Sequence, residues 1–452
     1  MKGHPERAAE FAKDATRVET TDRNMWTARS SRDRARAAVP DWEELRTAAS
    51  TIKAHTMSRL DHYLTQFADS ATANGIHVHW AKDAEEHNQI VLKLLREAEV
   101  TEVVKSKSML TEECELNPFL ERNGIPVIDT DLGERVVQLR EEAPSHIVTP
   151  AIHLNRGQIA QTLAEHLHSD PDNDDPHYLT SVVSKDLRGR IHRSKVALTG
   201  VNYAVAELGG IVICTNEGNV DLAVATSDIH IASMGIEKII PRLADLPVFL
   251  RLLARSATGM PSTIYTSHFT GPRQDSTMHV IIVDNGRSQL LADEDHREAL
   301  HCIRCGACAN TCHVTRRGGG HAYDFSTSGP IGSIVAPARD HDRYGSLPFA
   351  CTLCGSCSDV CPVRIPLHRL HLSWRRRLLS QGHVSADKRR LLAQMNMVLR
   401  TPQRYRLAGK ALRTALRIAP GLLARLSPWG KQRDLPPAPP ESFRDWYRKH
   451  RK

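Results

Sequence analysis

The chain has 452 residues, a length typical of two or three domains with sizeable hydrophobic cores. The hydrophobic fraction of 40% and the charged fraction of 25% indicate a globular protein. No stretch approaches the roughly 18 uninterrupted apolar residues of a membrane-spanning helix. An aromatic content of only 5% argues against a base-stacking surface for single-stranded nucleic acid.

Charge is divided unevenly along the chain. The formal net charge is +8, and residues 363–452 contain 22 lysines and arginines against 4 aspartates and glutamates. This segment therefore carries about +18 and residues 1–362 about −10. The basic character of the protein belongs to its C-terminal part alone.

The first 40 residues are polar and rich in Arg, Asp and Ala. We interpret residues 1–40 as a mobile or loosely helical arm. From Trp42 to about Phe67 the apolar residues recur at helical spacing, which predicts a helix at the start of the next domain.

Between about 75 and 290, short β-rich runs alternate with helical patterns. The predicted strands are 76–80, 126–128, 147–149, 211–214, 222–225 and 280–283, and the predicted helices are 84–98, 109–122, 156–168 and 177–190. This alternation indicates an α/β domain with a largely parallel sheet, which we place at residues 41–295. Neither a Gly-x-Gly-x-x-Gly fingerprint after a strand nor a Walker-type phosphate loop is present.

Two polar segments of this domain are candidate ligand sites. Residues 215–219 follow a predicted strand, and loops beyond the carboxyl ends of parallel strands are where such folds bind ligands. Residues 105–108 precede a predicted helix and offer cations for a carboxylate or phosphate. The candidates are Glu217 as a base or hydroxyl ligand, and Lys105, Lys107, Ser108, Asn216 and Asn219 as binding groups. A polar turn and a solvated surface explain the same residues equally well.

Eight of the ten cysteines form two copies of one spacing, Cys-x-x-Cys-x-x-Cys-x-x-x-Cys. The first copy is Cys302, Cys305, Cys308 and Cys312, and the second is Cys351, Cys354, Cys357 and Cys361, followed by Pro362. This run carries two [4Fe–4S] clusters in bacterial-type ferredoxins, where the fourth cysteine of each run ligates the other cluster. Tetrahedral zinc has no place for a third cysteine so close, and disulfides need an oxidising compartment.

The interleaving rule gives the two ligand sets. One cluster takes Cys302, Cys305, Cys308 and Cys361, and the other takes Cys351, Cys354, Cys357 and Cys312. We expect Gly306 and Gly355 to let backbone amides turn toward sulfur, within a domain at residues 296–365. The remaining cysteines, Cys114 and Cys214, are interpreted as buried, inert thiols.

The C-terminal region, residues 366–452, is predicted to be helical and basic. Ser385 is a candidate helix cap, and Leu391, Met395 and Leu399 share one face of the helix that follows. A second helix after Pro402 has apolar and cationic sides. Such a region packs on the core, docks on an acidic partner subunit or adsorbs to an anionic membrane surface. We expect no nucleic-acid binding, because no binding motif accompanies the charge.

Several strings outside the cysteine runs resemble the lactate utilization protein B family. They include residues 105–113, 129–134, 144–148, 215–219, 234–238, 255–259, 319–323 and 442–446. The resemblance extends from about Trp42 to the C-terminus. This chain departs from the family at His313, where proline is usual, and at Cys351, where many members have serine.

The resemblance implies a lactate-utilization domain similar to sugar-phosphate isomerases and CoA transferases, followed by a small α-helical ferredoxin-like domain with two [4Fe–4S] clusters. It also implies an electron-transfer subunit of a multiprotein system that oxidises L-lactate to pyruvate. The implied partners are a cysteine-rich protein and a small lactate-utilization protein.

Three interpretations of function therefore stand side by side. The first is electron transfer during oxidation of L-lactate or of another 2-hydroxy acid such as glycolate, with the hydride-accepting site on a partner or unrecognised in this chain. The second is an isomerase- or transferase-like enzyme with regulatory clusters, and the third is a non-enzymatic sensor or scaffold. The start of the chain lacks a secretory signal, so we expect a cytoplasmic protein, with membrane contact only through the basic tail.

Overall fold

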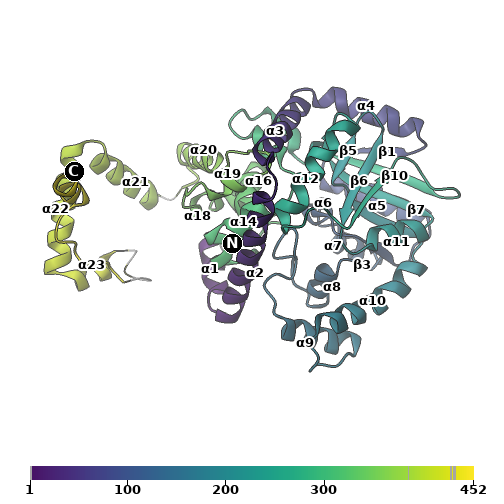
Figure 1. Cartoon of the computed structure of the whole chain (residues 1–452), viewed down its shortest axis with the longest axis horizontal. Helices are drawn as coiled ribbons and strands as arrows, with labels where there is room; N and C mark the ends of the chain where they lie inside the picture. The colour runs from purple at the N-terminus through teal and green to yellow at the C-terminus, as the bar shows by residue number, and fades with distance from the viewer. Residues whose placement is uncertain (1–2, 385, 428–429, 431–433, 452) are drawn as a thin grey trace. The chain divides into compact units, whose positions relative to one another are not determined.

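The computed structural model describes residues 3–384, 386–427, 430 and 434–451 (Figure 1). Two compact units are present, Met1–Arg377 and Leu378–Lys452. The first unit contains an α/β domain, the N-terminal helices and the cysteine runs.

A six-stranded sheet forms the centre of the α/β domain, and all five strand pairings in it are parallel. In sheet order the strands are β1 (His77–Ala81), β10 (Thr277–Val283), β7 (Ile229–Gly235), β4 (Val196–Gly200), β2 (Val103–Lys105) and β3 (Val127–Asp129). Because the strands are parallel, all their carboxyl ends lie at one edge of the sheet.

A smaller, mostly antiparallel sheet lies in the same domain. Its order is β8 (Ile239–Ile240), β5 (Tyr203–Val205), β6 (Gly210–Thr215) and β9 (Tyr265–Phe269). Strand β6 pairs antiparallel with both β5 and β9. The loop after β6 therefore follows a strand of this second sheet, and not a strand of the parallel sheet as the sequence analysis assumed.

Helices cover both faces of the central sheet, as in other α/β proteins. Adjacent residues of β2 show this division, because Val103 packs with Val91 and Leu120, whereas Val104 packs with Leu163 and Val183. The helices of this domain are α5 (Ala84–Glu97), α6 (Met109–Glu113), α7 (Leu116–Arg122), α8 (Leu132–Leu139), α9 (Arg156–Leu167), α10 (Pro176–Arg193), α11 (Asn219–Thr226), α12 (Leu246–Ala257) and α13 (Arg287–Ala292), with the short 3-10 helices η1 (Ile236–Lys238) and η2 (Leu243–Asp245).

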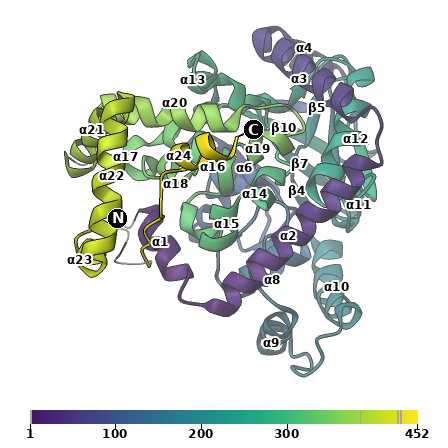
Figure 2. The same ribbon diagram turned by 60° about the vertical axis from the view of Figure 1, so that its left-hand side comes forward.

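The N-terminal segment is helical and packed. It forms α1 (His4–Phe11), α2 (Ala15–Ala37), α3 (Trp42–Ser58) and α4 (Leu60–Ala73). Helix α2 lies against α12 of the α/β domain and against two helices of the cysteine-rich region, α14 and α15 (Figure 2). Met25 on α2 is fully buried. The segment interpreted as a mobile arm is thus part of the compact unit.

The cysteine-rich region consists of short helices joined by tight turns. Its elements are η3 (Arg297–His301), α14 (Ala307–Thr311), α15 (His313–Gly318), η4 (His321–Tyr323), α16 (Gly329–Arg339), α17 (His341–Tyr344), α18 (Leu347–Ala350), α19 (Ser356–Val360) and α20 (Leu367–Ser380). Gly320 touches the α/β domain so closely that a Cβ atom there would lie 1.6 Å from the carbonyl oxygen of Ser145. The two regions therefore share a tight junction.

The second unit contains α21 (Ala386–Leu399), α22 (Pro402–Ile418), α23 (Pro420–Leu426) and α24 (Phe443–His450). Thr401 caps α22 through its side chain, and Ser442 caps α24 in the same way. The proposed cap Ser385 lies outside the described residues. Within the described part of the chain, no helix combines the length and apolar character needed to cross a membrane.

Two predicted strands are wrong. Residues 147–149 form no strand, because the imidazole Nδ1 of His146 accepts the backbone amides of Val148 and Thr149 at 3.2 Å each. Residues 222–225 lie inside α11, which begins after the left-handed Gly218. Periodicity alone does not separate a short apolar run in a strand from one in a helix.

Candidate iron–sulfur and ligand sites

The two cysteine runs begin with turns of the same shape. Arg304 and Gly306 flank the second cysteine of the first run with φ of 59° and 75°, and Leu353 and Gly355 do so in the second run with 61° and 83°. The left-handed backbone turns amides toward sulfur. The amide nitrogens of Arg304 and Leu353 lie 3.4 Å and 3.3 Å from the sulfur of the first cysteine in their runs. Such N–H···S bonds stabilise a bound thiolate.

Four thiols from both runs surround one small cavity. They belong to Cys302, Cys305, Cys308 and Cys361. Helix α19 packs on α14, which brings Cys361 back to the first run. Burial raises the pKa of Cys361 to about 11, although the amide of Ile365, 3.4 Å from its sulfur, opposes this.

The other four thiols form a second group. Burial, together with negative charge on Cys351, Cys312 and Cys354, raises the pKa of Cys357 to about 12. Cys354 is exposed, whereas Cys305, Cys308 and Cys361 of the first group are buried. The neighbours of Cys357 in this group belong to its predicted set, although Cys357 also lies near Cys308, and the exposed thiol belongs to the second group.

The remaining cysteines and His313 lie outside both groups. Cys114 is buried, and burial raises its pKa to about 12. Cys214 is only half-buried and lines a larger cavity, described below. His313 is exposed at the first turn of α15, and its Nε2 lies 3.1 Å from the hydroxyl of Thr352.

Buried cations from the N-terminal helices surround the first thiol group. The guanidinium of Arg32 donates to the carbonyl of Val360 at 3.2 Å, and that of Arg46 donates to the carbonyl of Cys361 at 2.9 Å. The amine of Lys53 donates to the carbonyl of Glu237. The exposed fractions of Arg32, Arg46 and Lys53 are 2%, 9% and 3%. Sequence analysis missed these residues, because their position depends on contacts across more than 180 residues.

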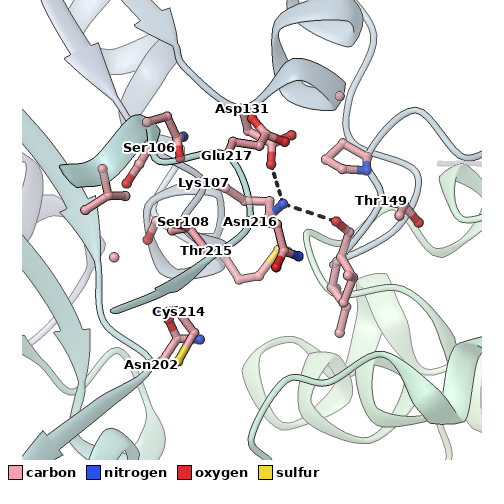
Figure 3. A pocket seen from close by; sticks show the side chains of 18 of the residues that line it. Ser106, Lys107, Ser108, Asp131, Thr149, Asn202, Cys214, Thr215, Asn216 and Glu217 are labelled. Atoms are coloured by element: carbon pink, nitrogen blue, oxygen red, sulfur yellow. Dashed lines mark hydrogen bonds and ion pairs between the residues drawn. The ribbon is translucent and has the colours of Figure 1, made fainter. Parts of the chain in front are cut away.

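A cavity of about 960 Å³ lies at the carboxyl edge of the central sheet. Its walls come from the loops after β2, β3, β4 and β7 and from the loop after β6. Figure 3 shows the candidates Lys107, Ser108, Asn216 and Glu217 among the side chains that line it. The candidates in its wall are Lys107, Ser108, Asn216, Glu217 and Asn219.

Glu217, Lys107 and Asp131 form an ionic group in this cavity. The amine of Lys107 donates to the Asp131 carboxylate and to the carbonyl of Val148 at 3.1 Å (Figure 3). The carboxyl of Glu217 accepts from the amide of Leu132 at 3.1 Å and remains open to solvent. Partial desolvation by the walls and the charge of Asp131 raise the pKa of Glu217 to about 7. A carboxyl with such a pKa exchanges protons near neutral pH.

Lys105 is not in the cavity. Its side chain is fully buried, and its amine lies 2.7 Å from a carboxylate oxygen of Asp129 and 3.1 Å from one of Glu112. Asp129 is the residue of β3 directly opposite Lys105 in the sheet. Although burial alone lowers it, these carboxylates raise the pKa of Lys105 well above its usual value. Lys105 therefore joins the two strands from within the core.

The cavity extends to the first thiol group. Arg304 and Cys305 of the first turn lie in its wall, together with Lys238 at the end of η1. Cys305 also lines the small cavity among the four thiols. Cys305, which belongs to the first thiol group, thus also forms part of the wall of the larger cavity.

Comparison with known proteins follows the same division of the chain. The LUD domain family matches residues 64–289, and the 4Fe-4S dicluster domain family matches residues 298–365. Lactate utilization protein B of Bacillus thuringiensis (strain Al Hakam) is 38% identical over 438 residues, covering 94% of this chain and 92% of that protein. The chain belongs to the lactate utilization protein B family.

Two further comparisons extend this result. The uncharacterized electron transport protein YkgF of Escherichia coli (strain K12) is 40% identical over 423 residues, covering 90% of this chain and 88% of that protein. A solved DUF162 family protein from Deinococcus radiodurans has 15% identity and a TM-score of 0.28, and covers 50% of this chain and 98% of that one. That TM-score is too low to support a statement about the fold.

As a member of the lactate utilization protein B family with a dicluster domain, the protein binds two [4Fe–4S] clusters. The donor atoms fit, because the eight thiols form two groups of four. Burial keeps most of these thiols protonated, and bound iron is the positive charge that removes their protons. Cys302, Cys305, Cys308 and Cys361 would hold one cluster, and Cys312, Cys351, Cys354 and Cys357 the other.

Serine substitutions test these ligand sets. We expect Cys361→Ser to remove the same cluster as Cys302→Ser and to lower the iron content from about eight to about four per chain. The measurements are iron and sulfide content and the EPR spectrum of anaerobic, reduced protein. Cys114→Ser is the matched control and should retain all the iron. If Cys361→Ser instead lost the cluster that Cys354→Ser removes, the interleaved assignment would be contradicted.

Lys105→Met tests the core ion pair. Removing the amine leaves the carboxylates of Asp129 and Glu112 without their buried cation, so we expect the free energy of unfolding to fall by about 3–5 kcal/mol. Urea unfolding of native and variant samples with equal iron content measures this free energy. Lys93→Met, at an amine whose side chain is 75% exposed, should change it by less than about 1 kcal/mol. If both substitutions changed the free energy of unfolding equally, the buried ion pairs of Lys105 would make no specific contribution to stability.

Proposed function

We propose that this protein is the iron–sulfur electron-transfer subunit of a multiprotein system that oxidises L-lactate to pyruvate. Its family membership supports the proposal, since the relatives carry the names lactate utilization protein B and electron transport protein. The observation that carries it is the position of Cys305, which lines both the 960 Å³ cavity and the first thiol group. When bound, [4Fe–4S] clusters accept and release single electrons.

We further propose the cavity as the binding site for the hydroxy acid. In this proposal Lys107, Ser108, Asn216 and Asn219 bind the acid and Glu217 takes the hydroxyl proton. Its raised pKa makes Glu217 a stronger base than an ordinary carboxylate. The side chains do not distinguish L-lactate from glycolate, and the name of the family gives the preference for lactate.

The proposed assembly includes a cysteine-rich protein and a small lactate-utilization protein, as the family implies. We propose a cytoplasmic location with a peripheral membrane contact through the second unit. On α22, Leu407 and Ile418 are 68% and 78% exposed, on a helix that also carries Arg406, Lys410 and Arg413. Exposed apolar groups beside cations are typical of helices that lie on anionic membranes.

Anaerobic reduction by lactate tests the electron-transfer function. The full chain is purified with its partner subunits, and L-lactate is added while the absorbance of the clusters is followed. We expect bleaching with L-lactate and none with acetate, which lacks the hydroxyl group. Clusters that stay oxidised with lactate although dithionite bleaches them would refute the function. Turnover of a substrate by the isolated chain without any change in its clusters would favour an isomerase- or transferase-like enzyme.

Glu217→Gln tests the proposed base. A base must be deprotonated, so in the native protein the rate of lactate-dependent bleaching should rise with pH through about 7 and then level off. Glutamine cannot accept the proton, and we expect the rate to fall by about 10²–10⁴-fold and to lose this rise. Glu294→Gln, whose side chain is 91% exposed, is the control and should leave the profile unchanged. An unaltered pH profile in Glu217→Gln would exclude the residue as the base.

A further inference from the structure

The cavity has a second polar region, distinct from the Lys107–Glu217 group. The charges nearest Lys107 are those of Asp131, Glu134 and Glu217. Those nearest Lys238 are Glu237, Arg304 and Cys302. The cavity therefore has one ionic group at the loops after β2, β3 and β6, and another beside the first thiol group.

The cations of this second region are only loosely paired, through Glu237. Within the described part of the chain, the amine of Lys238 has no hydrogen-bond acceptor, and the Nη1 atom of Arg304 is buried without one. The nearby carboxylate of Glu237 is engaged by the Nε of Arg287 at 2.6 Å and lies 3.9 Å from Arg304. Glu237 thus offsets part of the charge of Lys238 and Arg304, but its close ion pair is with Arg287, so both cations face the cavity with capacity for a further anion.

Hydroxyl groups in the cavity wall are also unsatisfied. The hydroxyls of Ser106 and Thr215 are buried and have no partner among the described residues, and Ser106 is only 5% exposed. Figure 3 shows both residues among those that line the cavity. Buried polar groups without partners in a cavity wall are the groups that a ligand would satisfy.

The cavity is larger than a three-carbon acid needs. About 960 Å³ is at the upper end of the range for cofactor-sized ligands. The walls between the polar regions are apolar and include Ile147, Val201 and Ile213. This space fits an aromatic body with an anionic group at one end.

We propose that the cavity binds a flavin with a phosphate group, and that Lys238 and Arg304 hold the phosphate beside Cys305. The inference rests on the proposed function, which requires two electrons from each hydroxy acid to become single electrons. The acid gives its hydroxyl proton to Glu217 and a hydride, which carries two electrons and one proton, to the flavin, and this leaves the 2-oxo acid and the reduced flavin. The flavin then releases the electrons one at a time, and this is the chemistry that flavins supply to enzymes.

Binding of flavin mononucleotide and riboflavin tests the proposal, because the two differ only by the phosphate. The full chain with both clusters is titrated anaerobically with each compound, and flavin fluorescence is followed. We expect the mononucleotide to bind at least about tenfold more tightly than riboflavin, and Lys238→Met and Arg304→Gln each to remove this preference. Lys93→Met is the surface control and should keep it. Iron content and reduction by dithionite verify that the variants retain their clusters.

The outcomes separate this inference from the proposed function. Equal affinity of the native protein for both compounds, absence of binding, or an unchanged preference in both variants would each overturn the flavin site. If lactate still bleaches the clusters of the assembled subunits in that case, the electron-transfer function stands without it. If the mononucleotide binds as expected but lactate never bleaches the clusters, the site stands and the lactate function fails.

Discussion

The rest of the structure depends on placing eight thiolates and their iron in the interior of a folded chain. Burial raises the pKa of Cys357 and Cys361 and so opposes the charged form that binds metal. Bound iron offsets the cost of burying the negative thiolates, and buried cations of the chain add to this effect. Arg32, Arg46 and Lys53 are nearly inaccessible, yet their hydrogen bonds to the first group's surroundings go to neutral backbone carbonyls. Arg32 and Arg46 are also ion-paired, with Asp33 at 2.9 Å and Glu43 at 2.8 Å, whereas Lys53 donates to a neutral carbonyl and keeps its charge for the neighbouring thiolates.

These cations explain why the N-terminal helices belong to the compact unit. Arg32 lies on α2, and Arg46 and Lys53 lie on α3. All three precede residue 64, where the match to the LUD domain family begins, and all are far from the dicluster match at 298–365. The segment outside both family matches thus provides part of the environment of the first thiol group. Since a buried cation stabilises the more negative state of a neighbouring site, Lys53, which interacts with Cys302, favours the reduced form of that site.

The sequence predicted the chemistry of the iron site better than its surroundings. Cysteine spacing is local, and Cys302, Cys305, Cys308 and Cys361 line one small cavity, while the two ligand sets stay a prediction. Lys105 and Lys107 looked equivalent in the sequence, but the register of β2 and β3 places Asp129 opposite Lys105 and buries the pair. The strands β2, β4 and β7, whose loops form the cavity, were not predicted. Conversely, residues 147–149 and 222–225 were predicted to be strands, but neither segment is one.

Lys238 shows why the second polar region was out of reach of the sequence. Nothing in its local pattern marks it, and its position beside Arg304 depends on contact between η1 and the first cysteine turn. That contact is fixed by the junction between the two regions. Gly306 approaches the imidazole of His146 so closely that a Cβ atom would lie 3.0 Å from it, and Gly320 meets the carbonyl of Ser145. The hydroxyl of Ser328 donates to the same carbonyl at 3.2 Å.

The junction also accounts for the relation between the cavity and the clusters. Interiors are close-packed, so contacts of this kind leave little freedom for one region to move against the other. Cys305 is therefore held in the cavity wall by the same contacts that join the regions. The second thiol group, with Cys354 exposed, lies on the solvent side. Under the proposed function, this asymmetry gives electron flow a direction, from the ligand in the cavity to a partner that docks at the exposed thiol.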